Sequence, residues 1–225
     1  MKNLLILLLA LGTVTMFSCK KASGEEAKVS EAAAVATSVG QDIPVSLSSS
    51  VVNWEGAKPT GTHTGTISLS EGVVTLKDGE VAGGSFTLDM TSITNTDQEG
   101  DMKAGLEAHL KGLAEGKEDH FFNTPVHPTG KFEITKVTEL NNDPAASHLV
   151  YGNLTLKGIA KEVGFKANVK VDGSSVSVVT PPFTIDRTQW GVNYGSKSVF
   201  DDLGDKFVND EIGLTITLNA SKQAM

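Results

Sequence analysis

The sequence IGLTITLNA, residues 212–220, alternates apolar side chains with polar or small ones. A period of two predicts a β-strand with one apolar face and one polar face. The strand is long, and as an open edge of a sheet it would invite aggregation. Closing the sheet on an earlier strand removes that edge, and this closure predicts a barrel.

The same alternation recurs from about residue 45 onward, and residues 163–172 give its cleanest example. Turn signals such as Asp78-Gly79 and Asp172-Gly173 separate the predicted strands. The chain therefore predicts about eight or nine strands in an all-β antiparallel barrel or sandwich, rather than a βαβ arrangement. A barrel of eight strands has room for side chains or for one small ligand.

Three local patterns interrupt the predicted strands. Glu71-Gly72 predicts a turn, and Gly83-Gly84 inside a strand predicts a bulge, a bend or a close approach. Residues 101–114 place apolar side chains four, four and three positions apart, which predicts one short helix with Asp101 as its N-cap.

The first residues predict export and a lipid anchor. Residues 1–18 have one positive charge and an apolar run that is short against the ~20 residues of a membrane-spanning helix, so they predict a signal peptide. Ser18 precedes Cys19, the sole cysteine, as in a bacterial lipobox. We therefore expect Cys19 to be lipidated, with plain secretion as the alternative.

Composition excludes several classes of function. The formal net charge of −8 argues against nucleic-acid binding and against a polybasic grip on anionic membranes. One cysteine permits no disulfide within the chain. Residues 20–44 are rich in alanine, serine and glutamate without an aromatic residue, so residues 19–44 predict a lipidated cysteine with a flexible tether before a barrel domain at 45–221.

The sequence gives no positive argument for an enzyme. The five histidines form no His-x-x-x-His pair. His109, His120 and His127 lie near the predicted helix and its exit and are candidates for a metal site, but we expect solvated or core-edge histidines. No Gly-x-Ser-x-Gly elbow surrounds a serine. We predict no catalytic residue, no metal site and no cofactor.

An ordered set of residues carries a family resemblance. It consists of Trp54 with KPTGTH at 58–63; GGSF at 83–86 with DMTSI at 89–93; GLEAHLK at 105–111 with Phe121-Phe122; His127-Pro128 with Phe132; GNLTLKG at 152–158; and IDR at 185–187 with Trp190-Gly191. Together these motifs closely resemble the bacterial YceI-like family over residues 45–221.

The resemblance implies an extended eight-stranded antiparallel barrel of lipocalin-like shape, with an apolar tunnel for a long isoprenoid, quinone-like or polyprenyl, or for another lipid. It also implies export to the periplasm. Because this chain adds a lipobox-like cysteine, we expect a lipoprotein of the bacterial cell envelope, in the outer membrane and facing the periplasm or the cell surface. Its expected partners are an apolar lipid and, through the anchor, the membrane; a homodimer stays open.

Aromatic residues on or beside the predicted strands are the candidates for the tunnel wall. They are Phe86, Phe121, Phe122, Phe132, Phe165, Phe183, Trp190 and Tyr194. Asp186 and Arg187 predict a structural frame, as an ion pair or by fixing the backbone. Two alternatives to lipid binding stay open: a structural or interaction barrel with a filled core, and a lipid enzyme with a His/Asp pair opening into the cavity.

The anchor can be tested by a Cys19→Ser variant. Loss of the acylated thiol is expected to move the protein from the membrane fraction to the soluble fraction, because no acyl chain then holds it in the bilayer. The measurement is fractionation beside the wild type. A variant that stays with the membranes as the wild type does would contradict the anchor.

Overall fold

A computed structural model describes residues 22–37 and 39–222 as strands with one α-helix and three short 3-10 helices. The strands are β1 (Glu25–Glu26), β2 (Lys28–Glu31), β3 (Gln41–Pro44), β4 (Val51–Lys58), β5 (Gly61–Lys77), β6 (Glu80–Asn95), β7 (Thr129–Glu139), β8 (His148–Leu156), β9 (Ile159–Asp172), β10 (Ser175–Val179), β11 (Phe183–Asp186) and β12 (Glu211–Ser221). The helices are η1 (Leu47–Ser49), α1 (Gly100–Lys111), η2 (Arg187–Trp190) and η3 (Gly204–Lys206).

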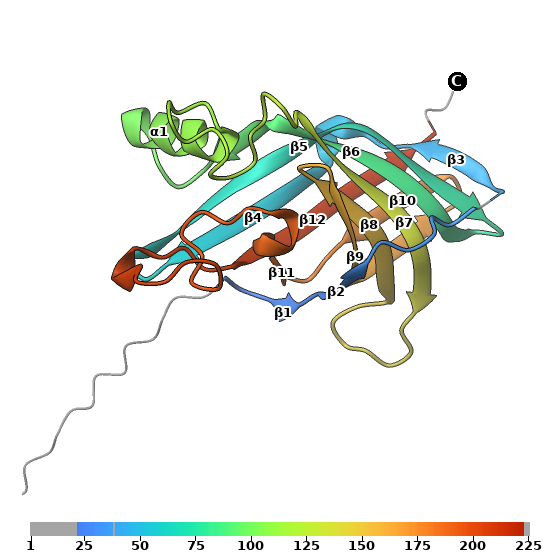
Figure 1. The fold of residues 1–225 in the computed structure, drawn as a ribbon. Helices are drawn as coiled ribbons and strands as arrows, with labels where there is room; N and C mark the ends of the chain where they lie inside the picture. The colour runs from blue at the N-terminus through green and yellow to red at the C-terminus, as the bar shows by residue number, and fades with distance from the viewer. Residues whose placement is uncertain (1–21, 38, 223–225) are drawn as a thin grey trace, which may run out of the picture.

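Eight strands close into an antiparallel ring in the order β4-β5-β6-β7-β8-β9-β10-β12 (Figure 1). β12 closes it, since residues 217–221 pair with β10 and residues 212–217 pair with β4. The ring is uneven, because the first residues of β12 pair with β11 instead of β10. The predicted all-β barrel with one helical insertion is confirmed.

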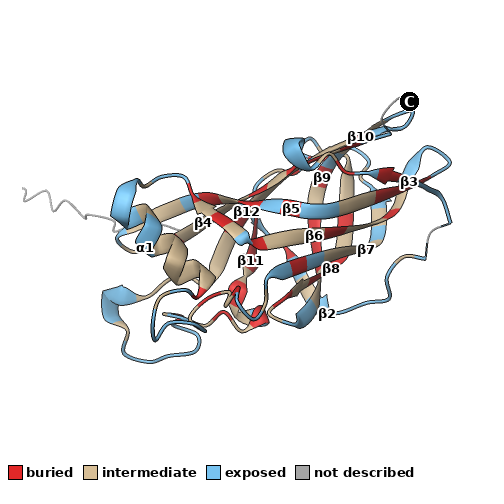
Figure 2. Ribbon diagram, turned by 90° about the horizontal axis from the view of Figure 1, so that it is seen from above, coloured by how far each residue is buried: buried red, intermediate tan, exposed pale blue. Residues whose placement is uncertain are grey.

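The alternation in the sequence sorts side chains between the interior and the solvent. In β9, Phe165 and Ala167 are buried, whereas Asn168 and Lys170 are exposed. Figure 2 shows such buried and exposed positions along the strands of the ring. Burial of one apolar face per strand supplies the hydrophobic core.

The predicted turn at Glu71-Gly72 is wrong. β5 continues through these residues and pairs with β6 on both sides of a register shift between Leu69 and Glu71. A β-bulge absorbs one extra residue and bends the strand without ending it, which is why the glycine here does not make a turn.

The glycine pair in β6 allows a close approach, as predicted. A Cβ on Gly84 would lie 2.8 Å from the Val73 carbonyl oxygen and 3.0 Å from the Phe86 ring, both closer than ordinary contact. β5 and β6 also shift register at Thr75 and Leu76, beside this pair. Glycine therefore lets β6 bend tightly over the core.

The helix α1 starts at Gly100, so Asp101 lies inside its first turn and is not the N-cap. Glu99 occupies the N-cap position without a side-chain hydrogen bond. The helix ends at Gly112, whose φ of 74° suits a residue without a Cβ. Asp101 still favours the helix, because a carboxylate near the N-terminus complements the helix dipole.

Residues 25–37 and 39–44 form a belt around the outside of the barrel, in contrast to the flexible tether predicted for residues 20–44. β1 pairs with β11, β2 pairs with β9, and β3 pairs with β5. Between these strands, Asn153 accepts a hydrogen bond from the Ala33 N–H at 2.9 Å and donates one to the Ala33 carbonyl at 2.7 Å. The belt covers backbone groups of β9 and β11 that the ring leaves unpaired.

The predicted signal peptide and Cys19 lie outside the described residues. Among the residues that are described, no helix is both long and apolar enough to cross a membrane.

Asn153→Ala tests how the belt is held. Removing both hydrogen bonds is expected to lower the free energy of unfolding by about 1–3 kcal/mol, because the Ala33 backbone loses its partner, and to speed hydrogen exchange in the belt. The matched control is Asn168→Ala, which removes a side-chain bond to the Ala145 carbonyl in a loop. Equal exchange in the belt of both variants would contradict this role.

Candidate functional site: an apolar tunnel with one polar end

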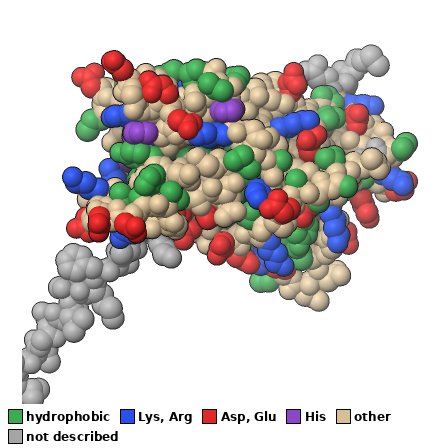
Figure 3. All heavy atoms as spheres, viewed as in Figure 1, with side chains coloured by type: hydrophobic (Ala, Val, Ile, Leu, Met, Phe, Trp, Pro, Cys, Tyr) green, Lys and Arg blue, Asp and Glu red, His purple; other side chains and the backbone are tan. Residues whose placement is uncertain are grey.

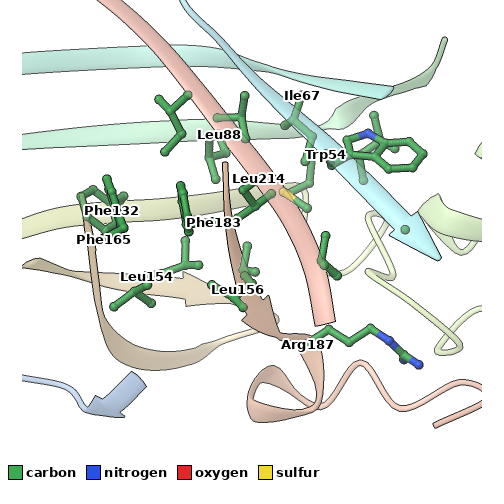
Figure 4. Close-up of a pocket in the computed structure, with 18 of the residues that line it drawn as sticks. Trp54, Ile67, Leu88, Phe132, Leu154, Leu156, Phe165, Phe183, Arg187 and Leu214 are labelled. Atoms are coloured by element: carbon green, nitrogen blue, oxygen red, sulfur yellow. The ribbon is translucent and has the colours of Figure 1, made fainter. Parts of the chain in front are cut away.

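The barrel encloses a cavity of about 440 Å³, within the range of small-molecule sites. Side chains from all eight strands of the ring, from β11 and from α1 line it. In Figure 4, Phe132, Phe165, Phe183 and Leu88 gather in the interior beside the translucent strands. The lining is mostly aliphatic and aromatic, so this cavity suits an apolar ligand.

Seven of the eight aromatic residues predicted for the wall line the cavity. They are Phe86, Phe121, Phe122, Phe132, Phe165, Phe183 and Tyr194. A row of rings crosses the interior: the centroids of Phe132 and Phe165 are 5.6 Å apart, and Phe165 stacks on Phe183 at 4.6 Å. Their contact with a ligand stays a prediction.

Trp190 does not line the cavity, in contrast to the prediction. Its side chain is fully buried, and its indole N–H donates to the Leu154 carbonyl at 2.9 Å. Trp190 lies in η2, after the end of β11, and side chains in a 3-10 helix do not alternate between the two faces of a sheet. The inward position that alternation predicts therefore does not apply to Trp190. Trp190 therefore fixes η2 against β8 from outside the cavity.

Most of the wall was missed because it is aliphatic. Strand residues that share inward positions with the predicted aromatics line the cavity as well, among them Ile67, Leu69, Leu88, Leu154, Leu156, Leu214 and Ile216. The signal that could have found them is the alternation itself, since every inward position of a closed barrel faces the same interior.

One end of the cavity is polar. Its lining includes Lys58, His63, His109, Tyr194 and Lys206. Two of these, His109 and Tyr194, belong to α1 and to the loop after η2. No aspartate or glutamate of the described residues lines the cavity. A ligand with an apolar tail and a hydrogen-bond-accepting head would match this division.

Arg187 holds the loop that borders this end. Its buried guanidinium donates to the carbonyls of Val192, Tyr194 and Val208, and its Nε donates to the Asn209 carbonyl at 3.0 Å. Burial lowers the pKa of Arg187, and the carboxylates of Asp210 and Asp186 oppose that shift. The hydrogen bonds of this side chain therefore go to backbone carbonyls within residues 192–209.

Asp186 fixes the backbone on the other side of the frame. Its carboxylate accepts from the Thr188 N–H at 2.9 Å and from the Thr188 hydroxyl at 2.6 Å, which caps η2. The ion pair of Arg187 is made with Asp210, at 3.6 Å. The structure therefore shows Asp186 and Arg187 as two groups that fix the backbone. The ion-pair partner of Arg187 is Asp210, the residue directly before β12.

Two of the three candidate metal-ligating histidines, His109 and His120, lie side by side at the polar end. The Nε2 atom of His109 lies 2.9 Å from Nδ1 of His120, and His120 stacks on Tyr194. Burial lowers the pKa of His109, and positive charge on His120 and Lys117 lowers it further. His127 does not join this pair, and the described residues contain no group of three or more metal-ligating side chains.

A His/Asp pair lies beside the polar end, and only its histidine lines the cavity. Nδ1 of His63 lies 2.9 Å from the Asp97 carboxylate, and His63 lines the polar end. Burial alone would raise the pKa of Asp97, but hydrogen bonds, first from the Thr64 N–H and then from His63, outweigh it and keep that pKa below its ordinary value. This pair meets one requirement of the lipid-enzyme alternative.

The wall contains one polar atom without a partner among the described residues. The indole Nε1 of Trp54 is buried and makes no hydrogen bond. Trp54 lines the cavity and lies opposite Gly65 of β5. Figure 4 shows its ring at the side of the cavity where Arg187 lies. An unsatisfied buried donor is costly, so this indole N–H lowers the stability of the fold.

The histidine pair predicts a dependence of stability on pH. Because the pKa of His109 is lowered in the folded protein, the unfolded chain binds the proton more readily, and the free energy of unfolding falls as the pH drops below the ordinary histidine pKa of about 6.5. His109→Gln is expected to reduce this fall in urea unfolding between pH 7.5 and 5. His148→Gln, on β8, is the control. A slope in His109→Gln equal to the wild type would contradict the prediction.

Comparison with known proteins agrees with this architecture. BcnA from Burkholderia cenocepacia has a TM-score of 0.59 and 20% identity, with 79% of this chain and 99% of that chain covered. A polyisoprenoid binding domain from Saccharophagus degradans, implicated in plant cell wall breakdown, has a TM-score of 0.57 and 13% identity, covering 84% and 99%. A mutant CJ YceI protein has a TM-score of 0.50 and 18% identity, covering 68% and 81%. At these identities the likeness shows the fold.

No curated protein matches the chain in sequence. The family model of the YceI-like domain matches residues 43–220, which is most of the chain. The closed ring, the apolar cavity and the helical insertion occur within that matched range. The chain therefore belongs to the YceI-like domain family.

Proposed function

We propose that this protein holds the tail of an isoprenoid, or of another long-chain lipid, in its barrel cavity, for transport, storage or sequestration. The observation that carries the proposal is the cavity itself, about 440 Å³ of mostly aliphatic and aromatic lining with polar groups gathered at one end. Membership of the YceI-like family, whose members are binding proteins, supports it. So does the solved neighbour named as a polyisoprenoid binding domain.

Burial of the tail supplies the affinity in this proposal. Each CH₂ group taken from water into an apolar site contributes about 0.8 kcal/mol, so a dozen carbons need few polar contacts. The row of rings from Phe132 to Phe183 offers flat apolar surface to an unsaturated chain. The head group would lie at the polar end, among side chains such as Lys58, His109 and Tyr194.

Export and anchoring belong to the same proposal. The predicted signal peptide and the lipobox-like Cys19 support an envelope lipoprotein that works beside the membrane from which its ligand comes. An apolar ligand of this kind dissolves in bilayers and not in water, so a carrier attached to a membrane meets it at high local concentration.

The filled-core alternative predicts no continuous internal tunnel, and a cavity of about 440 Å³ argues against it. The lipid-enzyme alternative stays as a second candidate because of His63 and Asp97 at the polar end. It predicts a changed lipid product that His63→Gln abolishes while binding persists. Mass spectrometry of bound lipid before and after incubation decides between an enzyme and a binding protein.

Native mass spectrometry followed by lipid extraction tests the proposal, and Leu88→Trp sharpens it. Leu88 lines the cavity midway along β6, so a larger side chain there is expected to displace two or three CH₂ groups and weaken binding of a long isoprenoid quinone by roughly 10-fold or more. The matched control is Thr87→Trp, on the opposite face of the same strand.

Thr87→Trp is expected to bind like the wild type. Repeated recovery of empty wild-type protein, together with no binding of added isoprenoid quinone, would overturn the proposed function. Equal loss of affinity in both variants would show that the effect came from the fold and not from the cavity.

A further inference from the structure

Five large apolar side chains are exposed at the polar end of the barrel. The exposed fractions are 69% for Met102, 61% for Leu113, 38% for Tyr194, 46% for Val199 and 48% for Phe200. We call these five residues the apolar rim. Figure 1 shows that α1 and the loop after η2, which carry the rim, lie at the same end of the barrel, and Figure 3 shows hydrophobic side chains among charged ones over that end.

We propose that the apolar rim docks on the surface of a lipid bilayer, so that a lipid tail passes from the membrane into the cavity without crossing water. This inference rests on the proposed function, because it names the bilayer as the source of the lipid that the cavity holds. Four features support docking: α1 continues the cavity wall toward the rim, hydrogen bonds hold the loop of the rim, the described chain starts beside the rim, and the charges around the rim nearly balance.

The apolar stripe of α1 continues the cavity wall outward. Met102, Leu106 and Leu110 recur at helical spacing in α1, and Leu106 and Leu110 line the cavity. Met102 is exposed, as is Leu113, which follows the left-handed Gly112 at the end of the helix, and no residue of α1 is fully buried. A helix packed only by its middle residues leaves an apolar face that a bilayer surface can cover.

Hydrogen bonds hold the loop on the facing side in place. Arg187 donates to the Tyr194 carbonyl at 2.8 Å, and the Phe200 N–H donates to the carbonyl of the fully buried Ser196 at 2.9 Å. Tyr194 both lines the cavity and reaches the surface. Because these bonds fix the loop, Val199 and Phe200 stay exposed, and their exposed surface adds nothing to the hydrophobic core. Exposed apolar side chains that are grouped in this way favour an interaction with a partner surface.

The described chain starts at this same end. A Cβ on Gly213, at the start of β12, would lie 3.3 Å from the Ala22 side chain. Cys19 precedes Ala22 by three residues, a span of at most about 11 Å for an extended chain. An acylated Cys19 would therefore hold the rim, and not the far end of the barrel, against the membrane.

Charge near the rim selects the kind of membrane. In the loop that carries Phe200, Asp201, Asp202 and Asp205 outnumber Lys197 and Lys206 by one, and Asp101 and Lys103 flank Met102 in α1. This near-neutral balance gives little attraction to anionic lipids, so contact depends on the apolar side chains. The occupant that fits is a zwitterionic bilayer surface. Binding by the rim alone is expected to be weak, and the lipid anchor would make it stable.

The first experiment locates the membrane-facing end in the full chain. A tryptophan is introduced by Phe200→Trp at the rim or by Leu47→Trp in η1. Leu47 is exposed and follows Ser46, whose N–H donates to the Asn219 carbonyl near the end of β12. Phosphatidylcholine vesicles with brominated acyl chains should quench the rim tryptophan at least about two-fold more strongly than the control, after subtraction of the wild-type signal. Equal quenching, or none at position 200, overturns the docking proposal.

The second experiment measures transfer of geranylgeraniol from phosphatidylcholine vesicles. A Met102→Glu, Phe200→Glu double variant is expected to take up the isoprenoid about 10-fold more slowly than a Leu47→Glu, Val179→Glu control, since charge at the rim opposes insertion. Both variants should bind it equally when it is supplied from detergent. Unchanged transfer in the rim variant overturns the proposal.

These readouts separate the two proposals. If neither the wild type nor any variant binds isoprenoid from detergent, the proposed function is wrong. Quenching at position 200 would still test membrane docking in that case. If the rim instead joins two copies of the chain, sedimentation would show a dimer that the double variant dissociates, with no quenching. That result overturns membrane docking.

Discussion

The backbone ladder between β12 and β4 is the constraint on which the rest of the structure depends. Six residue pairs, from Ile212 with Gly56 to Thr217 with Val51, join the last strand to the first strand of the ring. Without them the sheet would have two open edges, and the inward faces would lie against solvent. With them, eight apolar faces surround one interior, and the cavity is the volume that their side chains leave unfilled.

The polar end exists because the chain leaves the ring there. α1 follows β6, and the loop after η2 precedes β12, so both insertions lie where strands of the ring begin or end. Arg187 donates hydrogen bonds to backbone carbonyls of this loop, so its guanidinium group holds the loop in place. The histidines and lysines that remain give the tunnel a polar end opposite to an apolar interior.

The barrel and most of its aromatic wall could be predicted because alternation within a strand is a local property. The belt could not, since it is held by backbone pairing and by the amide of Asn153, and backbone pairing leaves no mark in side-chain composition. The ion pair of Arg187 with Asp210 was equally hidden, because the two residues are far apart in the chain. Trp190 was misplaced because strand alternation stops at η2.

Closure by β12 also determines when this protein can fold. The pair of Val51 with Thr217 joins residues 166 positions apart, since 217 − 51 = 166. Contacts of such long sequence separation form slowly, and the ring has no closed form until almost the whole chain is available. A chain of this topology stays open while it is synthesised, and it completes its barrel only after its last strand is available.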